Sequence, residues 1–544
     1  MRRMVRGWAI GILFLGFSAL PAQSKDQLVV GMTAFPASVH PFVSSSTTAN
    51  YMLGAARREV VRRDGDGKIM CQLCTEVPSV KNGRAREVTL PDGGKAMEVT
   101  FTLRPDLKWG DGTSLTTKDI VFGFEVSRTF LPPVNTTGVV ALDDLNYVVK
   151  LNSLRYDFDR LSPSPVNAAI EEPILRAATG PLDYAAKSTF TRAPETPGLW
   201  NGPYLIVEFD PSQKASFAPN PYWDGEKPVF KQVTMRLVGN TAALQANLLS
   251  GDIDMASGLT TTQALDLQKR YADRFDISFV QAFSTAYLYS QLGNSNLADK
   301  RIRQAIVLGI DRQTIVSRLF DGRLSVATSI LAPVDLSYDK DIKPWPYDPA
   351  RARELLAQAG YKPGTDGILE RSDGTRLSLE LLTMAGVGDY PLLQQVIQSQ
   401  LKQIGIEIIP KSEATKELWG VTLPRRAFKG LVLGTWITCP DCIPIREFGT
   451  AGIPQESNKF GGYNYTGYSN PILDAVLTGA LAELDPAKRQ VMWNEIQTTL
   501  MEDLPQIPLY NGGYVLQGPK WMTGLMPIRS TYLPTLWIEY WRPR

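Results

Sequence analysis

Four cysteines are the residues whose spacing most directly suggests chemistry. They form two C-x-x-C pairs, Cys71 with Cys74 and Cys439 with Cys442, far apart in the chain. Two such pairs can supply the four thiolates of a zinc site, but in an exported protein an even number of cysteines is more often oxidised to disulfides. Proline and glycine neighbours disfavour a thioredoxin-like site. We favour disulfides at all four positions, and zinc binding, free thiols and the pairing pattern stay open.

Signatures of enzymatic catalysis are scarce. The single histidine, His40, excludes an H-E-x-x-H zinc motif, and a Ser-His-Asp triad would depend on that one residue. Neither G-x-S-x-G nor G-x-x-x-x-G-K-[ST] occurs. His40 follows the first expected strand, where we interpret it as a packed loop residue. A hydrolase that uses two carboxylates stays an alternative, because 55 acidic residues always offer pairs.

The composition indicates a folded globular protein. The 544 residues are 44% hydrophobic and 21% charged, which leaves room for two to four structural units at roughly 100–200 residues each. Lys and Arg number 57 and Asp and Glu 55, a formal charge of +2. This balance excludes electrostatic binding of nucleic acid, so we expect no such partner.

The first 24 residues have the pattern of a secretory signal peptide. Three arginines precede an apolar stretch at 8–20, and the small residues Ala22 and Ser24 stand where a signal peptidase cleaves. A stretch of 13 residues is too short to cross a membrane, which needs about 20. No cysteine stands directly after this stretch, so we expect a cleaved signal, no lipid anchor and an exported, periplasmic product.

Helices that alternate with short apolar strands predict a mixed α/β fold. The expected strands include 27–31, 98–103 and 406–409. Asp348, with Pro349 at the first helical position, predicts a helix that stops at Gly360. The same signal, Asp485-Pro486, predicts another. The tract 64–67 resembles the start of a calcium loop, but it lacks the glycine expected at position six and therefore predicts a hairpin turn.

Several separated blocks resemble, in the right order, the extracytoplasmic solute-binding proteins of ABC importers, in the class of dipeptide, oligopeptide and nickel-complex receptors (family 5). The strongest block is FTLRPDLKWGDGT at 101–113, followed by TTKDIVF at 116–122. Others are NGPY at 201–204, PNPYW at 219–223, LSGDID at 249–254, ADKRIRQAI at 298–306, IDR at 310–312, 347–361 and PQIPLY at 505–510. The resemblance covers essentially the whole mature chain.

The resemblance implies a two-lobed periplasmic-binding-protein fold with a hinge and an extra domain inserted in lobe I. Lobe I would comprise 25–55, 196–282 and 506–544, the extra domain 56–195, and lobe II 283–505. A solute would lie between the lobes and favour their closure, without any bond being made or broken.

The resemblance also implies ligand contacts. In peptide-binding members an aspartate three residues after a tryptophan of lobe II pairs with the ligand's α-ammonium group. Here Trp436, the expected aromatic wall, is followed by Cys439 at that place, with Asp441 two positions later. Asp441 therefore either reaches the ligand or is an ordinary turn aspartate. Further expected ligand residues are Thr438, Tyr510, Phe35, Leu259 and Thr260.

The function implied is a receptor, not an enzyme, that delivers a peptide or peptide-like solute to an ABC permease and its ATPase subunits. We expect a monomer without cofactor or bound metal. A receptor for an opine, a metal chelate or an oligosaccharide stays an alternative, and a secreted carboxylate-pair hydrolase is a more distant one.

Overall fold

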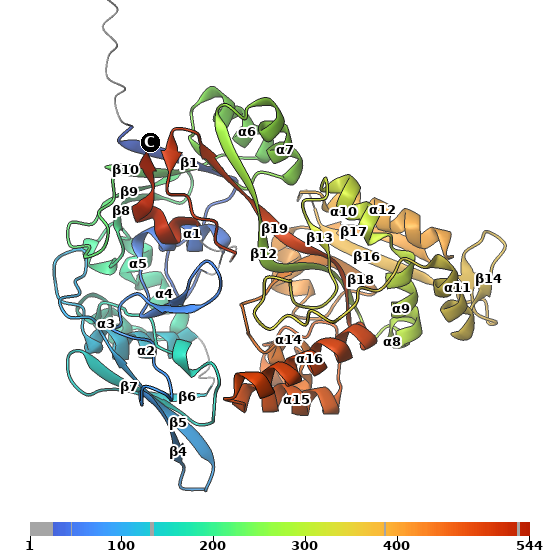
Figure 1. The fold of residues 1–544 in the computed structure, drawn as a ribbon, viewed down its shortest axis with the longest axis horizontal. Coiled ribbons are helices and arrows are strands. Elements are labelled where there is room, and N and C mark those ends of the chain that lie inside the picture. Colours follow the sequence, from blue (N-terminus) through green and yellow to red (C-terminus); the bar gives the residue numbers. More distant parts are fainter. Residues whose placement is uncertain (1–24, 45, 131–134, 386–387, 530–533) are drawn as a thin grey trace, which may run out of the picture.

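The computed structural model describes residues 25–44, 46–130, 135–385, 388–529 and 534–544 (Figure 1). The predicted signal peptide, 1–24, lies outside these residues. Helices and strands alternate along the chain, and three sheets of four or more strands organise the described residues. The mixed α/β architecture expected from the sequence is therefore confirmed.

A five-stranded sheet combines the N-terminal strand with residues 204–257. Its order is β11 (Met255–Ser257), β1 (Gln27–Met32), β10 (Gln232–Leu237), β9 (Lys214–Pro219) and β8 (Tyr204–Asp210). β1 runs parallel to both neighbours, and α6 (Thr241–Ser250) makes the crossover from β10 to β11. Leu28 and Val30 of β1 are fully buried in the core against α1 (Thr47–Ala56) and the sheet. α7 (Thr261–Arg270) follows β11.

A four-stranded antiparallel sheet lies between β1 and β8 in sequence. Its order is β4 (Ala85–Thr89), β5 (Lys95–Thr102), β7 (Asn146–Leu151) and β6 (Thr136–Ala141). The hairpin of β2 (Val61–Arg63) and β3 (Ile69–Cys71) precedes it, turning at 64–67 as predicted. The accompanying helices are α2 (Thr117–Phe130), α3 (Ala168–Ala177), α4 (Pro181–Lys187) and α5 (Thr189–Arg192).

The five-stranded and four-stranded sheets belong to one half of the molecule. A six-stranded sheet forms the centre of the other half. Its order is β13 (Ser325–Val326), β19 (Gln506–Pro519), β12 (Phe275–Ser290), β18 (Leu431–Ile437), β16 (Ser378–Met384) and β17 (Glu407–Glu413). Its core packs against α9 (Lys300–Gly309), α10 (Arg312–Leu319), α11 (Pro349–Gln358) and α12 (Tyr390–Gln403). Asp348 caps α11 through the Arg351 amide at 2.9 Å, with Pro349 in its first turn, as predicted.

The remaining α-helices and strands are short or lie beside these sheets. They are α8 (Ser295–Ala298), α13 (Thr415–Glu417), α14 (Ile445–Phe448), α15 (Pro471–Ala482), α16 (Pro486–Asp503), β14 (Lys362–Pro363), β15 (Leu369–Glu370), β20 (Met522–Thr523) and β21 (Arg542–Pro543). Asp485 caps α16, as its sequence predicts.

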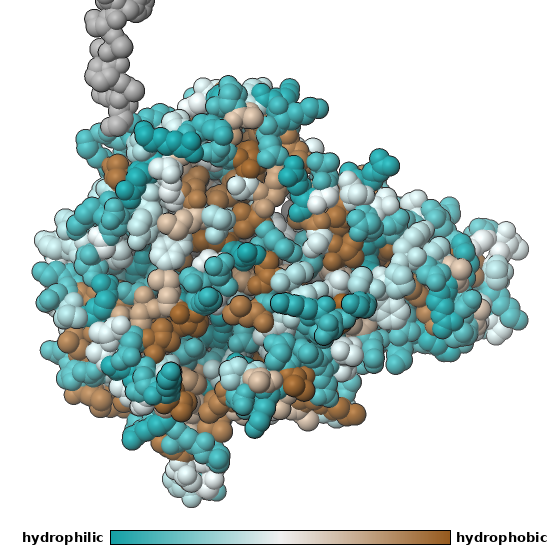
Figure 2. Space-filling model, viewed as in Figure 1, coloured by the Kyte–Doolittle hydropathy of each residue, from teal (hydrophilic) through white to brown (hydrophobic). Residues whose placement is uncertain are grey.

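The long strands β12 and β19 connect the two halves. They pair along almost their whole length, with a register shift between Gln281 and Thr285. Beyond the shift they belong to the six-stranded sheet; at the other end, the Gln517 side chain accepts a hydrogen bond from Ala256 of β11 at 2.8 Å. Figure 1 shows this pair running between the two halves of the molecule, and Figure 2 shows apolar residues gathered in a band along the same junction.

Candidate ligand-binding site

A cavity of about 630 Å³ lies where the two halves meet. Residues 59–69 and 155–160, beside the four-stranded sheet, form one side, which we call the N-terminal wall. Residues 436–448, apart from Asp441, together with Tyr463 form most of the other side, the C-terminal wall. This volume falls within the range of small-molecule sites, which is about 300–1,000 Å³.

Trp436 and Thr438 are the two predicted ligand residues that line this cavity. Pairing of β18 with β12 places Trp436 opposite Thr285, and its ring lies 5.2 Å from Tyr463 and 6.2 Å from Trp419, centroid to centroid. The Thr438 amide donates to the Phe283 carbonyl at 2.8 Å, which fixes the chain just beyond the strand. The end of β18 therefore presents an aromatic wall to the cavity.

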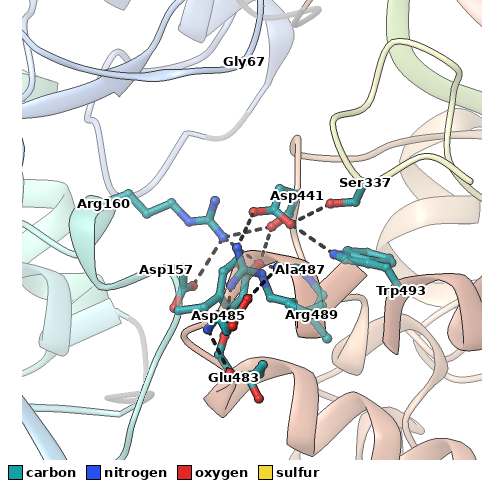
Figure 3. A network of polar contacts seen from close by, with 12 residues as sticks. Gly67, Asp157, Arg160, Ser337, Asp441, Glu483, Asp485, Ala487, Arg489 and Trp493 are labelled. Atoms are coloured by element: carbon teal, nitrogen blue, oxygen red, sulfur yellow. Dashed lines mark hydrogen bonds and ion pairs between the residues drawn. The ribbon is translucent and has the colours of Figure 1, made fainter. Parts of the chain in front are cut away.

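Asp441 lies beside the cavity but is turned into the protein. Its carboxylate accepts hydrogen bonds from the Ser337 hydroxyl at 2.7 Å and from Trp493 Nε1 at 3.0 Å, and lies 3.9 Å from the Arg489 guanidinium (Figure 3). Asp441 does not line the cavity. A ligand contact by Asp441 stays a prediction, and it would require the carboxylate to exchange these partners.

The other predicted ligand residues do not line this cavity. Tyr510 packs 4.8 Å from Phe320 in the core of the six-stranded sheet, and Phe35 stacks on Phe209 at 6.4 Å. Leu259 is buried beneath α6 and α7, and Thr260 caps α7, accepting from the Gln263 amide at 3.2 Å. Their ligand roles stay predictions.

A polar network joins the two walls next to the cavity (Figure 3). The Tyr156 hydroxyl donates to the Asp441 carbonyl and accepts from the Ile443 amide at 3.2 Å. Arg160 also donates to the Asp441 carbonyl, at 3.2 Å, and the Tyr156 amide donates to the Leu481 carbonyl at 3.0 Å. These contacts hold the N-terminal wall against the loop that carries Asp441.

Asp335, which is buried, and Asp159, which is partly buried, accompany this network. Burial raises the pKa of Asp335 to about 6, opposed by hydrogen bonds from the Ser337 and Asp441 amides. Burial likewise raises the pKa of Asp159 to about 6, opposed by the charge of Arg63. The pKa values of both carboxyl groups therefore lie near 6.

The four cysteines lie in two local pairs. The Cα atoms of Cys71 and Cys74 are 5.1 Å apart and those of Cys439 and Cys442 are 5.5 Å apart, distances that suit a disulfide. Each cysteine lies beside its own C-x-x-C partner, and Cys439 and Cys442 line the cavity. Within the described residues, no group of three or more His, Cys, Asp or Glu side chains is arranged to hold a metal.

His40 is a packed residue, as the sequence suggests. It is fully buried among the rings of Phe130, Tyr184 and Phe190, and its Nδ1 accepts from the Phe42 amide at 3.2 Å. Burial, and secondarily the charge of Arg57, lowers the pKa of His40 to about 4. The side chain is therefore neutral at pH 7.

Comparison with known families decides what kind of protein this is. The family model of the bacterial extracellular solute-binding proteins, family 5 (middle), matches residues 91–441. This chain belongs to that family. It is therefore a solute-binding receptor and not an enzyme, as expected from the sequence.

Relatives of this solute-binding protein match it over most of their length. The oligopeptide-binding protein AppA of Bacillus subtilis is 27% identical over 481 residues, covering 84% of this chain and 83% of AppA. The nickel-binding periplasmic protein of Escherichia coli is 22% identical, covering 90% and 89%.

Solved structures share the fold. The oligopeptide-binding protein of Thermus thermophilus, complexed with a pentapeptide, superposes with a TM-score of 0.75 at 24% identity, covering 95% of each chain. NikA of Brucella suis, in complex with Fe(III)-EDTA, gives 0.78 at 17% identity, covering 95% of this chain and all of NikA. The two-lobed α/β fold is thus confirmed.

Sequence reasoning missed the charged groups of this solute-binding protein that line its cavity. On the N-terminal wall Asp157 accepts two hydrogen bonds from Arg155, both at 2.7 Å, and lies 3.5 Å from Arg160. On the C-terminal wall Arg446 and Glu447 follow the second cysteine pair. The alternating charged residues at 155–160 can be seen in the sequence. Nothing near them indicates that this segment contacts a loop 285 positions later in the chain.

In the part of the solute-binding protein that the structure describes, no helix is long and apolar enough to cross a membrane.

Proposed function

We propose that this solute-binding protein captures a peptide or peptide-like solute in the cavity between its two halves. The observation that carries the proposal is one cavity lined by both halves, with an aromatic wall at Trp436 and Tyr463. A solute there contacts both walls, so its binding energy favours the closed arrangement. Relatives named for oligopeptides, D,D-dipeptides and glutathione support a peptide-like ligand.

The cellular setting is part of the same proposal. Residues 1–24 act as a cleaved signal peptide, and the mature monomer works in the periplasm with an ABC permease and its ATPase subunits. Each cysteine pair is oxidised to a local disulfide, which the Cα separations of 5.1 and 5.5 Å support.

For the domain division we propose the ranges expected from the sequence. Residues 25–55, 196–282 and 506–544 make lobe I, 56–195 the extra domain and 283–505 lobe II. The five-stranded sheet draws its strands from the first set, and the four-stranded sheet lies wholly within 56–195. The hinge is proposed at β12, which crosses the boundary at 282–283, and at β19, which begins at the boundary at 505–506. The pairing of these two strands shifts register between Gln281 and Thr285.

A binding screen with a product assay tests the function. The purified protein is incubated with a pool of di- to pentapeptides, and its thermal stability and the chemical integrity of the pool are followed together. We expect a concentration-dependent rise in Tm with no peptide consumed, because a ligand that binds only the folded state stabilises it. Turnover of the pool, or stabilisation by sugars or metal chelates alone, would contradict the peptide-receptor proposal.

A further inference from the structure

Almost every carboxylate that lines the cavity already has a partner from its own wall. Asp157 is paired with Arg155 and Arg160, and Glu59 lies 3.8 Å from Arg62. Asp64 accepts the amides of Asp66 and Lys68 at 2.9 and 3.0 Å, within its hairpin turn. These carboxylates are therefore committed to holding the N-terminal wall together.

Glu447 is the exception among the cavity carboxylates. Its carboxylate forms no ion pair and no side-chain hydrogen bond with the described residues, although it is partly buried on the C-terminal wall. Burial raises the pKa of Glu447, opposed in part by the amides of Glu447 itself and Arg446 and by the charge of Arg446. An ionised carboxylate here gains more from a cationic partner than an exposed one would.

The neighbouring arginine does not supply that partner. The Arg446 guanidinium lies over the ring of Tyr463, 4.4 Å from its centroid. Within the described residues it forms no ion pair with the Glu447 carboxylate. Three aromatic rings, those of Trp436, Tyr463 and Phe448, line the same cavity as Glu447. Ring faces attract a positive charge, and the attraction is stronger once that charge has been removed from water.

We infer that Glu447 binds a positively charged group of the solute, such as an ammonium, beside the rings of Trp436 and Tyr463. The inference deepens the proposed function and rests on it, since it names the group by which the cavity recognises its solute. It assigns this role to Glu447 in place of Asp441, whose carboxylate is occupied by Ser337 and Trp493.

The test compares charge discrimination in two isosteric variants. A pool of tripeptides with free amino termini, and the same pool after N-acetylation, are titrated against the wild type, Glu447→Gln and Asp441→Asn. We expect the wild type to prefer the free pool by on the order of tenfold to a hundredfold, as for other buried charge pairs. Glu447→Gln loses this preference and folds normally, because no contact in the described structure is lost. Asp441→Asn keeps the preference, whatever stability it loses.

The outcomes separate this inference from the proposed function. A wild type that binds both pools equally, or a Glu447→Gln variant that keeps its preference, overturns the role of Glu447 and leaves the peptide receptor standing. A wild type that binds neither pool, but binds putrescine or choline through Glu447, overturns the peptide ligand and supports the inference. Binding of none of these probes overturns both.

Discussion

The hydroxyl group of Tyr156 donates a hydrogen bond to the backbone carbonyl of Asp441, a residue 285 positions later in the chain. The same oxygen accepts from the Ile443 amide, and the Arg489 guanidinium lies 4.4 Å from the centre of the Tyr156 ring. One phenol thus joins the N-terminal wall of the cavity to the loop between Cys439 and Cys442. The phenol is buried and bonds both backbone groups through one oxygen. Arg160 shares the Asp441 carbonyl, so loss of the phenol oxygen removes the Ile443 amide's partner and one of two donors to that carbonyl.

Tyr156→Phe removes that atom and should loosen the junction. We expect a loss of about 1–3 kcal/mol, because the Ile443 amide loses its partner and the Asp441 carbonyl keeps only Arg160, together with weaker solute binding and a larger radius of gyration. Tyr147→Phe is the matched control, since its hydroxyl meets Ser162 within the N-terminal part. Calorimetry and small-angle scattering make the comparison. Equal radii and affinities in the two variants would show that Tyr156 does not hold the walls together.

Asp335→Asn should stabilise the protein at neutral pH and not in acid. The folded pKa of Asp335, about 6, is above its unfolded value near 4, so the folded state binds the proton more tightly. The contribution of Asp335 to the free energy of unfolding is fully present below about pH 4 and is lost as the pH rises through 6. We expect the variant to exceed the wild type by about 1–3 kcal/mol at pH 7.5 and to match it near pH 4.

Denaturant unfolding at a series of pH values measures this difference. The substitution keeps the local turn, because the amide oxygen of the introduced asparagine can still accept from the Ser337 amide, which lies 2.9 Å from the present carboxylate. A stability difference that stays constant between pH 4 and 7.5 would contradict the raised pKa.

Trp436→Ala should weaken solute binding much more than it lowers stability. Its ring is only partly buried and lines the cavity, whereas Trp419, which contacts it, does not line the cavity. We expect a loss of affinity on the order of tenfold to a hundredfold for Trp436→Ala. Trp419→Ala is the control and should mainly lower Tm. The reverse pattern in a calorimetric titration would place the solute elsewhere.

Replacing the two cysteine pairs by serine should affect solute binding to different extents. Replacing Cys439 and Cys442 by serine frees the loop that meets Tyr156, so we expect a stability loss of about 2 kcal/mol and weaker solute binding. The Cys71 and Cys74 double serine variant should lose similar stability. Its affinity should change less, because neither residue lines the cavity. Equal affinity losses in the two variants would argue against a special role for the 439–442 loop.

Short sequence motifs predicted the local structure around them well. They could not predict contacts between residues that lie far apart in the chain. Asp348 and Pro349 predicted where α11 begins, because a cap and a first-turn proline act within four residues. The role of Asp441 depended on Ser337 and Trp493, which lie 104 and 52 positions away. Glu447 carried no motif at all. It stands out only once the fold shows which cavity carboxylates already have partners.

The most direct measurement is mass spectrometry of whatever small molecule is released when the protein, purified from its native periplasm, is denatured. A closed receptor retains bound solute, so we predict one peptide or peptide-like molecule with a positively charged group per protein chain. Release of a sugar or another solute without a cationic group, at the same stoichiometry, would contradict both the peptide-like ligand and the role of Glu447.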